Sequence, residues 1–418
     1  MTRIRCNGDS RWKMKNVGAY LFALSTLIFF AGVYISPSRI VTFFAAYTAM
    51  TAVYFVYFKK LKMYYTTLDF AWALYLLAGV IGAFASGIGI TKGLGDFALS
   101  ISLGLLLSLM AMSCIDREKQ INAIWGICIL VLIGCGMQFL AQDALLKITK
   151  VTLDAQQYTW HTEFIFLMKR VVGFSYQTGV TAHYLCLFEI LLIGMWCKSG
   201  SQHWSKRLFC IGGFLAGLVL ILLTEKRSNL LVVLILFAVM FYFAYHKRFL
   251  KYALAAIAVF VVAITATETG RSLINRTLGS NPFSGRLDIY GILWEMIKMN
   301  PLLGNGLGST LVYVTKYTNG HNIYLQTWAE CGLLGLAMLV IILAVNLKRA
   351  IKLMKCGFRT KSITSMEIFC VGYQIYFIVI GMIGNPLYDI YPLAMYMLTV
   401  GMVKSARVDY YRELKGTV

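Results

Sequence analysis

Residues 207–223, RLFCIGGFLAGLVLILL, and residues 228–246, SNLLVVLILFAVMFYFAYH, are two apolar runs separated by the short connection TEKR. Each run is close to the roughly 20 residues that an α-helix needs to cross the hydrocarbon core of a bilayer. A chain inside that core must satisfy its own backbone hydrogen bonds, and a helix does so within one segment. The stretch therefore predicts two membrane-spanning helices joined by a charged turn.

Apolar runs of this kind recur from one end of the 418-residue chain to the other. The sequence is 59% hydrophobic with a mean hydropathy of +0.70, whereas a soluble domain is nearer half apolar. These features predict an all-α, polytopic integral membrane protein with about twelve transmembrane helices, organised as one membrane domain over residues 1–418. The predicted spans are 17–35, 40–58, 68–88, 94–114, 121–141, 176–197, 207–223, 228–246, 249–267, 322–346, 367–384 and 387–405.

The formal charge of +21 would favour nucleic-acid binding in a soluble protein. In a membrane protein, Lys and Arg instead mark the loops that stay in the cytoplasm. Every second loop is basic here, and so are both termini, which predicts cytoplasmic termini, a cytoplasmic-membrane location and no nucleic-acid partner. The basic loops contain Lys59, Lys60 and Lys62; Arg117 and Lys119; Lys198, Lys206 and Arg207; Lys247, Arg248 and Lys251; and Lys348, Arg349, Lys352, Lys355, Arg359 and Lys361.

Two of the loops that face outward are long, at about 142–175 and 268–321. Long loops in compact proteins are more often functional than idle. Within the second loop, residues 287–300 have apolar side chains at helical spacing, which predicts an amphipathic helix on the outer membrane surface before the tenth span. Pro301 and Gly304 are expected to end it. The apolar positions are Leu287, Tyr290, Leu293, Trp294 and Ile297.

Three arginines depart from the rule that outward loops are poor in basic residues. Arg227 lies in the TEKR connection, Arg286 starts the amphipathic helix, and Arg170 closes the first long loop. A guanidinium presents a fork that suits phosphate, and a helix N-terminus offers free amides to an anion. The arginines are thus candidates for an anion site at the outer boundary. The alternatives are a snorkelling side chain for Arg227, a pair with Asp288 for Arg286, and an interfacial anchor for Arg170.

His321 stands just before the span 322–346 and after the glycine-rich stretch GNGLGS (304–309). A histidine can accept a proton near neutral pH, whereas arginine stays charged. His321 is therefore the candidate catalytic residue, with a helix-capping or interfacial histidine as the alternative. The glycine-rich stretch lacks the GxxxxGK[ST] pattern of nucleotide loops, and we expect its glycines to permit a tight re-entry of the chain toward the membrane.

Other polar residues are weaker candidates. Asn322 follows the histidine directly, and Glu330 is expected about two turns inside the same span. A carboxylate at that depth is costly, so Glu330 is expected either to pair with an outward arginine or to hydrogen-bond in the bundle. Glu189 is similarly placed in the sixth span. We expect His161 to be a loop residue and His183 to pack inside the sixth span.

Three stretches resemble the O-antigen ligase and O-antigen polymerase superfamily. They are LLTEKRSNLL (222–231), SGRLDIYGILWEMIKMNPLLGNGLGS (284–309) and GHNIYLQTWAECGLLGL (320–336), and the last two are the most specific. RVVGFSYQTG (170–179) resembles more loosely the Arg-x-x-Gly element that many members have before the sixth span. The pair Glu225–Lys226 departs from the Thr or Ser that many members have before the arginine.

The resemblance implies about twelve spans, a large outward loop late in the chain, and a glycosyltransferase that needs neither metal nor cofactor. Its donor is a glycan on undecaprenyl diphosphate, and a single displacement would invert the anomeric configuration. By the family's pattern Arg227 and Arg286 bind the diphosphate, and His321 activates or orients the acceptor hydroxyl. Further candidate contacts with donor or acceptor are Arg170, Asn322 and Glu330.

The family contains two activities that differ in the acceptor of the glycan, and both remain open for this sequence. A polymerase extends a glycan on another lipid-linked repeat unit, and a ligase transfers the finished glycan to lipid A-core or, in relatives, to a protein. The segment GMIGNPLYDIYPL (381–393) resembles polymerases of O-antigen or exopolysaccharide more closely, so we favour a polymerase, with a chain-length regulator as a candidate partner. A polysaccharide transporter or flippase is a further alternative, although the charges lie at the outer boundary rather than at the midplane.

Overall fold

The computed structural model describes residues 8–40, 67–87, 117–198, 204–245, 285–314, 319–360 and 363–416, with scattered positions within 42–49, 95–108 and 258–271. All regular secondary structure in these residues is helical. The predicted spans 40–58, 94–114 and 249–267, and the part of the outward loop before residue 285, lie largely outside the described residues.

Most of the membrane-length helices lie within a few residues of the predicted spans, but the first begins at residue 8 and the last two long ones continue to residues 359 and 416. In chain order, the helices are α1 (Gly8–Ile35), η1 (Pro37–Arg39), α3 (Thr67–Ala85), α5 (Arg117–Leu140), α6 (Gln142–Thr152), α7 (Ala155–Phe166), α8 (Thr178–Lys198), α9 (Trp204–Leu223), α10 (Arg227–Tyr245), α13 (Arg286–Met299), α14 (Thr310–Tyr313), α15 (Ile323–Arg359), α16 (Ser365–Ile380) and α17 (Ile390–Gly416).

Within the described residues, α3, α5, α8, α9 and α15 are long and apolar enough to cross a membrane, and three shorter apolar helices accompany them. The side of α3 that does not pack in the bundle carries large apolar side chains at helical spacing, as expected of a helix in contact with lipid. The prediction of an all-helical fold is confirmed for the described residues, and their five candidate spans agree with a polytopic membrane protein, whereas the number of about twelve spans stays a prediction. These exposed side chains are Phe70, Leu74, Leu77, Ile81 and Phe84.

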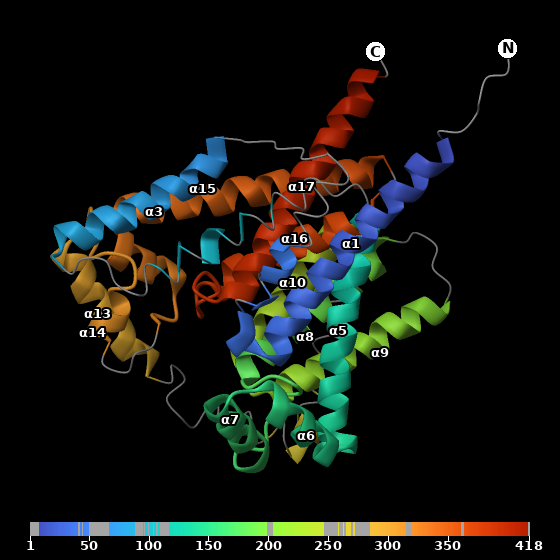
Figure 1. The fold of residues 1–418 in the computed structure, drawn as a ribbon, viewed down its shortest axis with the longest axis horizontal. Coiled ribbons are helices and arrows are strands. Elements are labelled where there is room, and N and C mark those ends of the chain that lie inside the picture. The colour runs from blue at the N-terminus through green and yellow to red at the C-terminus, as the bar shows by residue number, and fades with distance from the viewer. Residues whose placement is uncertain are drawn as a thin grey trace.

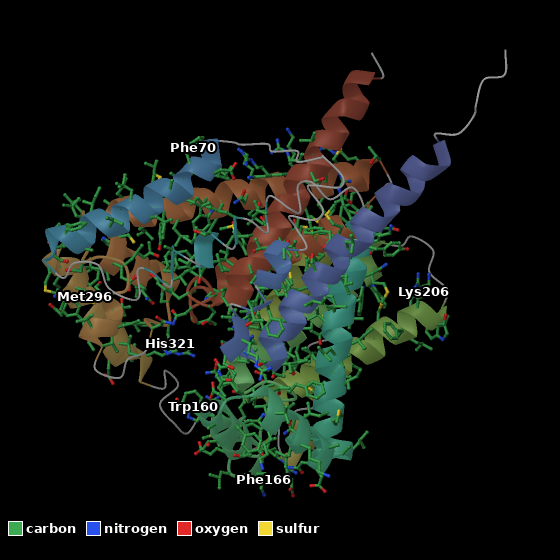
Figure 2. All side chains as sticks on the ribbon, in the orientation of Figure 1. Phe70, Trp160, Phe166, Lys206, Met296 and His321 are labelled. Carbon is green, nitrogen blue, oxygen red and sulfur yellow. The ribbon has the colours of Figure 1, made fainter. Side chains whose placement is uncertain are left out.

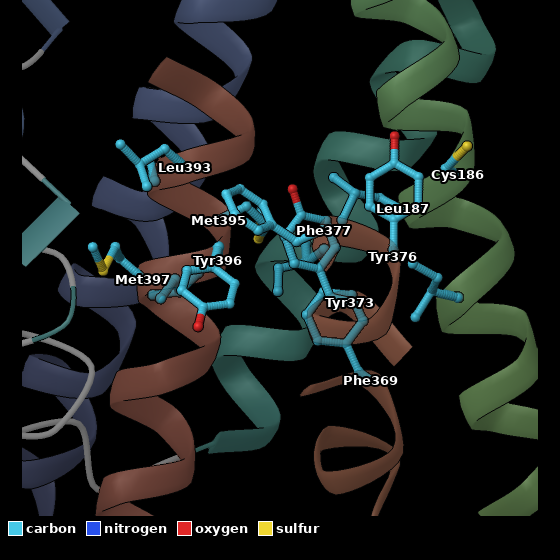
Figure 3. Close-up of a cluster of buried hydrophobic side chains, with 14 of the residues drawn as sticks. Cys186, Leu187, Phe369, Tyr373, Tyr376, Phe377, Leu393, Met395, Tyr396 and Met397 are labelled. Atoms are coloured by element: carbon cyan, nitrogen blue, oxygen red, sulfur yellow. The ribbon is translucent and has the colours of Figure 1, made fainter. Parts of the chain in front are cut away.

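Helix α8 lies at the centre of the bundle, where most of its surface is buried between α5, α9, α10 and α16. Figure 3 shows aromatic and aliphatic side chains of α8, α16 and α17 packed together in this core. Buried tyrosines need hydrogen-bond partners. Tyr184 donates to the carbonyl of Phe30 (3.0 Å), and Tyr373 donates to the carbonyl of Pro392 (3.2 Å). The core therefore ties α1, α8, α16 and α17 into one body.

Contacts between connecting segments agree with the predicted topology. Two loops predicted to face outward meet where the Ser36 hydroxyl donates to the Thr152 carbonyl (2.6 Å). Three segments predicted to face inward also meet, because Lys404 in α17 forms an ion pair with Asp69 at the start of α3, beside α15. Figure 1 shows the beginning of α1 and the end of α17 at one end of the molecule, opposite α6 and α7.

The first long outward loop, 142–175, is more regular than expected. Residues 142–166 form the two short helices α6 and α7, and the Asp154 side chain caps α7 by accepting from the amide of Gln157 (2.8 Å). Only the segment after α7 is irregular, and it returns across the ends of α5 and α9. This segment brings Arg170 to the charged turn between α9 and α10.

Helix α15 is broken at Gly332, whose φ of 67° and ψ of −171° are not helical. Backbone groups of residues 301–306, which include the start of the glycine-rich stretch, form hydrogen bonds with α15 at the break. The Gly306 amide donates to the Glu330 carbonyl (2.7 Å), and the Leu333 amide donates to the Pro301 carbonyl (3.0 Å). All three glycines of the stretch have positive φ, which only glycine adopts freely. The predicted tight turn is confirmed, and its effect is to hold the first turns of α15 as a separate unit.

The predicted amphipathic helix is confirmed as α13, but it does not lie alone. Leu293, Met296 and Ile297 are buried against Ala329 and its neighbours in α15. Its other side exposes apolar side chains, Leu287 and Trp294 among them, which is consistent with contact with the membrane. The packing fixes α13 beside the first turns of α15, where His321 lies.

Candidate functional site

The backbone around His321 is held in an unusual conformation. His321 has φ of 51°, a left-handed value that costs a residue other than glycine of order 1–3 kcal/mol. The Gly320 amide donates to Gln326 Oε1 (2.7 Å), and the Tyr290 hydroxyl donates to the His321 carbonyl (3.2 Å). The helix cap is Asn322, whose Oδ1 accepts two free amides of the first turn of α15. The capping alternative for His321 is therefore wrong.

Helix α13 supplies two residues to this site. Arg286 is its first residue and Tyr290 follows one turn later, on the same side of the helix. Arg286 is half-buried, whereas Asp288 is exposed, and within the described residues no ion pair joins them. The Arg286 guanidinium thus lacks the carboxylate partner that the alternative interpretation required.

The turn between α9 and α10 brings a second group of charges. Arg170 forms an ion pair with Glu225, in which Arg170 Nε donates to Glu225 Oε2 at 2.6 Å. The Val171 amide also donates to the Leu223 carbonyl (3.0 Å), so the segment after α7 is fixed to this turn. Lys226, the next residue, is half-buried and forms no ion pair with any described residue.

The cations approach one another and the histidine. Burial, followed by the charges of Arg170 and Arg286, lowers the pKa of Lys226, and Glu225 opposes this effect. Burial, followed by the charges of Arg286 and Lys226, lowers the pKa of His321 from its usual 6.5. In Figure 2, His321 lies on the side of α13 that faces the rest of the bundle. We call Arg170, Lys226 and Arg286 the outer cation cluster.

Arg227 has a less defined place than the sequence suggested. It is the first residue of α10 and half-buried, and its side chain makes no hydrogen bond or ion pair with the residues that the structure describes. The structure places Arg286 within electrostatic reach of His321, and it adds Lys226, which is within electrostatic reach of His321, Arg286 and Arg170. Charge in an outward turn was the sequence signal for both Lys226 and Arg227, and the family resemblance favoured Arg227.

Glu330 lies in the interior at 0% exposure and contacts the His321 segment indirectly, through Gln326. Its Oε2 accepts from the Tyr388 hydroxyl (2.7 Å), and its Oε1 accepts from Gln326 Nε2 (3.1 Å). Gln326 in turn holds the amide of Gly320, the residue before His321. Of the two alternatives for Glu330, the structure shows hydrogen bonding within the bundle and not a pair with an arginine. Its position is a supporting one, since protein donors occupy both oxygens.

The structure adds one titratable residue that the sequence reading missed. Asp389 follows the segment 381–388, which meets the His321 segment where the Ile323 amide donates to the Gly381 carbonyl (2.9 Å). Burial raises the pKa of Asp389 from 3.8 to about 7. Asp389 also lies near Tyr176, whose pKa burial and the Asp389 charge both raise. A carboxyl group that titrates near neutral pH is thus close to the outer end of the bundle.

His161 and His183, the other two histidines considered from the sequence, have structural places. His161 was expected in a loop, but it is fully buried in α7, where its Nδ1 lies 2.7 Å from the Ser175 carbonyl oxygen. Burial lowers its pKa. The error arose because the loop contains helices that were not expected. His183 packs inside α8 against Tyr376, as expected.

Replacing Tyr290 by phenylalanine tests how the histidine is held. We expect the rate of glycan transfer, the activity that the family resemblance implies, to fall about fivefold while the protein still folds. One hydrogen bond to the His321 carbonyl is worth about 1 kcal/mol. The control is Tyr313→Phe, at an exposed tyrosine of α14. Equal activity of Tyr290→Phe and the control would show that this bond does not position His321.

The arrangement combines cations that can hold a phosphate group with a neutral imidazole that can accept a proton. Arg286 and Lys226 have no carboxylate partner among the described residues, so an anion would complete their charge balance. Within the described part of the chain, no group of three or more His, Cys, Asp or Glu side chains is placed to hold a metal ion. The cations can therefore bind an anion, and the imidazole beside them can accept a proton from a hydroxyl group.

Residues 212–340 match a family model described as O-antigen ligase. Arg170 and Asp389 lie outside this match. The residues of the site that lie within it are Lys226, Arg227, Arg286, His321 and Glu330. No curated protein matches the chain.

Proposed function

We propose that this chain polymerises undecaprenyl-diphosphate-linked repeat units. Residues 212–340 match the model of the O-antigen ligase family, whose members ligate or polymerise lipid-linked glycans. The product is a surface polysaccharide, an O-antigen or an exopolysaccharide. The reaction takes place on the outer face of the bacterial cytoplasmic membrane. The loop charges support this orientation, because the basic loops mark the opposite face.

The observation that carries the proposal is the approach of Arg286 and Lys226 to His321. Two cations without a carboxylate partner among the described residues suit the diphosphate of the donor. A histidine whose pKa is lowered by burial and by the charges of Arg286 and Lys226 suits the acceptor hydroxyl, because only the neutral ring can accept its proton. Nucleotide sugars are absent outside the cell, so a donor on a lipid carrier also fits the predicted orientation.

The proposed reaction is a single displacement. The acceptor hydroxyl oxygen attacks the anomeric carbon of the donor sugar, and the bond from that carbon to the diphosphate oxygen breaks with its electron pair. Arg286, Lys226 and Arg227 stabilise the charge that grows on the leaving lipid diphosphate. His321 takes the hydroxyl proton. One displacement inverts the configuration at the anomeric carbon.

The description of the matched family favours a second candidate, a ligase that transfers the finished glycan to lipid A-core. Both candidates use the same donor half of the site, and they differ only in the acceptor. The discriminating experiment gives the purified protein a labelled lipid-linked repeat together with both acceptors. Label in longer glycans on the lipid carrier supports the polymerase, and label on lipid A-core overturns it in favour of the ligase.

The pH dependence of transfer identifies the base. We expect activity to fall on the acid side with a midpoint below pH 6.5, because His321 must be neutral to act and its pKa is lowered from 6.5. Lys226→Met should move this midpoint upward, since removing a nearby positive charge makes the ring easier to protonate. The measurement is kcat/KM against pH for both proteins.

The same profile can contradict the assignment. An acid midpoint at about pH 7 that Lys226→Met does not move would point instead to Asp389, whose pKa is about 7. Asp389→Asn separates the two cases, because it should leave the acid midpoint in place if His321 is the base.

A further inference from the structure

A second cluster of cations lies at the end of the bundle predicted to face the cytoplasm. It consists of Arg349 in α15 with Lys404 and Arg407 in α17, and Asp69 at the start of α3 is the carboxylate beside them. Lys404 and Asp69 form an ion pair, with the Lys404 side chain only 7% exposed. We call Arg349, Lys404 and Arg407 the inner cation cluster.

Arg349 is the unusual member of this cluster. Its Nη1 is buried and has no hydrogen-bond partner among the described residues. Its guanidinium lies within electrostatic reach of Arg407 and of Asp69. A buried N–H group without an acceptor is costly, and so is the approach of two guanidinium groups. Asp69 already binds Lys404.

The position of the cluster is rigid. Asn346, one turn before Arg349, donates through Nδ2 to the Tyr396 hydroxyl (3.3 Å), which joins α15 to α17. The Lys404–Asp69 pair joins α17 to α3. Each of the three helices therefore contributes to a fixed framework, in contrast to the exposed Lys348 and Lys352 on the same stretch of α15.

The depth of Arg349 suits a lipid headgroup. Arg349 is 27 residues after Asn322, the N-cap of α15. At the rise of an α-helix, the distance between these two residues along the helix axis is at most about 40 Å. That distance matches the thickness of a bilayer with its headgroup layers, about 40–45 Å. With Asn322 at one boundary, Arg349 lies near the opposite headgroup layer, where phospholipid phosphates are found.

We propose that the inner cation cluster binds a phosphate group, and that the phosphodiester of an anionic phospholipid in the cytoplasmic leaflet supplies it. A phosphate oxygen would accept from the buried Nη1 of Arg349 and would place a negative charge beside the guanidinium groups of Arg349 and Arg407. This site is separate from the outer cation cluster, and it lies at the opposite end of α15. It does not depend on the proposed transfer reaction.

The test measures lipid binding by the purified full-length protein. Phosphatidylglycerol, phosphatidylcholine and inorganic phosphate are titrated separately, with binding followed by native mass spectrometry and by the midpoint of thermal unfolding. We expect phosphatidylglycerol to bind the wild type and Arg349→Gln to weaken this binding about tenfold, since charge-assisted hydrogen bonds are lost. The matched control, Lys352→Gln on the exposed side of α15, should bind like the wild type.

The other outcomes are also decisive. Equal phosphatidylglycerol binding by Arg349→Gln and Lys352→Gln would overturn the proposal. Binding of inorganic phosphate that depends on Arg349, without preference for the lipid, would overturn the lipid as its source. If Arg349→Gln fails to fold, Arg349→Lys keeps the charge but loses the fork, and weaker lipid binding by this variant supports the site. Unchanged binding by Arg349→Lys and by Arg407→Gln would count against it.

Discussion

Replacing His321 by alanine is expected to lower glycan transfer by about 10²–10⁴-fold, the usual contribution of a positioned general base. The protein should fold normally, because the contacts that fix this segment are made by the Gly320 amide, the His321 carbonyl and the Asn322 side chain. Alanine keeps all of these backbone contacts. The measurement is the rate of transfer from a defined lipid-linked glycan by protein of matched purity and thermal stability.

Two controls sharpen this test. Lys298→Ala changes an exposed side chain at the far end of α13 and should transfer at the wild-type rate. Added imidazole should restore part of the activity of His321→Ala if the missing group is a proton acceptor. A His321→Ala protein that transfers within about threefold of the wild type would exclude His321 as the base, since far less than the contribution of a general base would have been lost.

Replacing Arg286 by alanine is expected to reduce kcat/KM by about 10²–10³-fold, comparable to the loss of one donor that stabilises a developing negative charge. Arg286 is half-buried, approaches Lys226 and His321, and has no carboxylate partner in the described residues, so the diphosphate is its expected partner. Arg286→Lys should recover only part of the activity, because an ammonium lacks the planar fork that binds two phosphate oxygens.

The control for Arg286 is Asp288→Ala, two residues along the same helix and exposed. It alters the charge of α13 by one unit in the opposite sense without touching the histidine, and its activity should stay close to that of the wild type. Equal losses in Arg286→Ala and Asp288→Ala would indicate a general effect on α13. Wild-type activity in Arg286→Ala would remove this residue from the proposed diphosphate site.

The membrane helices and the amphipathic helix could be predicted because their signal is local. Periodic apolar side chains placed α13 at 287–300, and the structure has it at Arg286–Met299. The break in α15 could not be predicted in the same way. Gly332 lies in an apolar run whose pattern predicts one continuous helix. The break forms because the glycine-rich stretch supplies backbone hydrogen bonds there, and this contact exists only in the folded chain.

The charged site was predictable in composition but not in detail. Basic residues in outward loops pointed to Arg170, Arg286 and the TEKR turn. Lys226 and Arg227 are adjacent in the sequence, and only the direction in which α10 starts decides which one approaches His321. Asp389 was missed because a single carboxylate before a span carries no sequence signal; burial is what shifts its pKa toward neutrality.

The most direct test of the account is a transfer assay in proteoliposomes that contain only the purified protein and a radiolabelled glycan on undecaprenyl diphosphate. The account predicts longer glycans on the lipid carrier, release of one undecaprenyl diphosphate for each glycosidic bond formed, and loss of both products in His321→Ala. The absence of transfer by the wild type to either a lipid-linked repeat or lipid A-core would contradict it, as would undiminished transfer by His321→Ala.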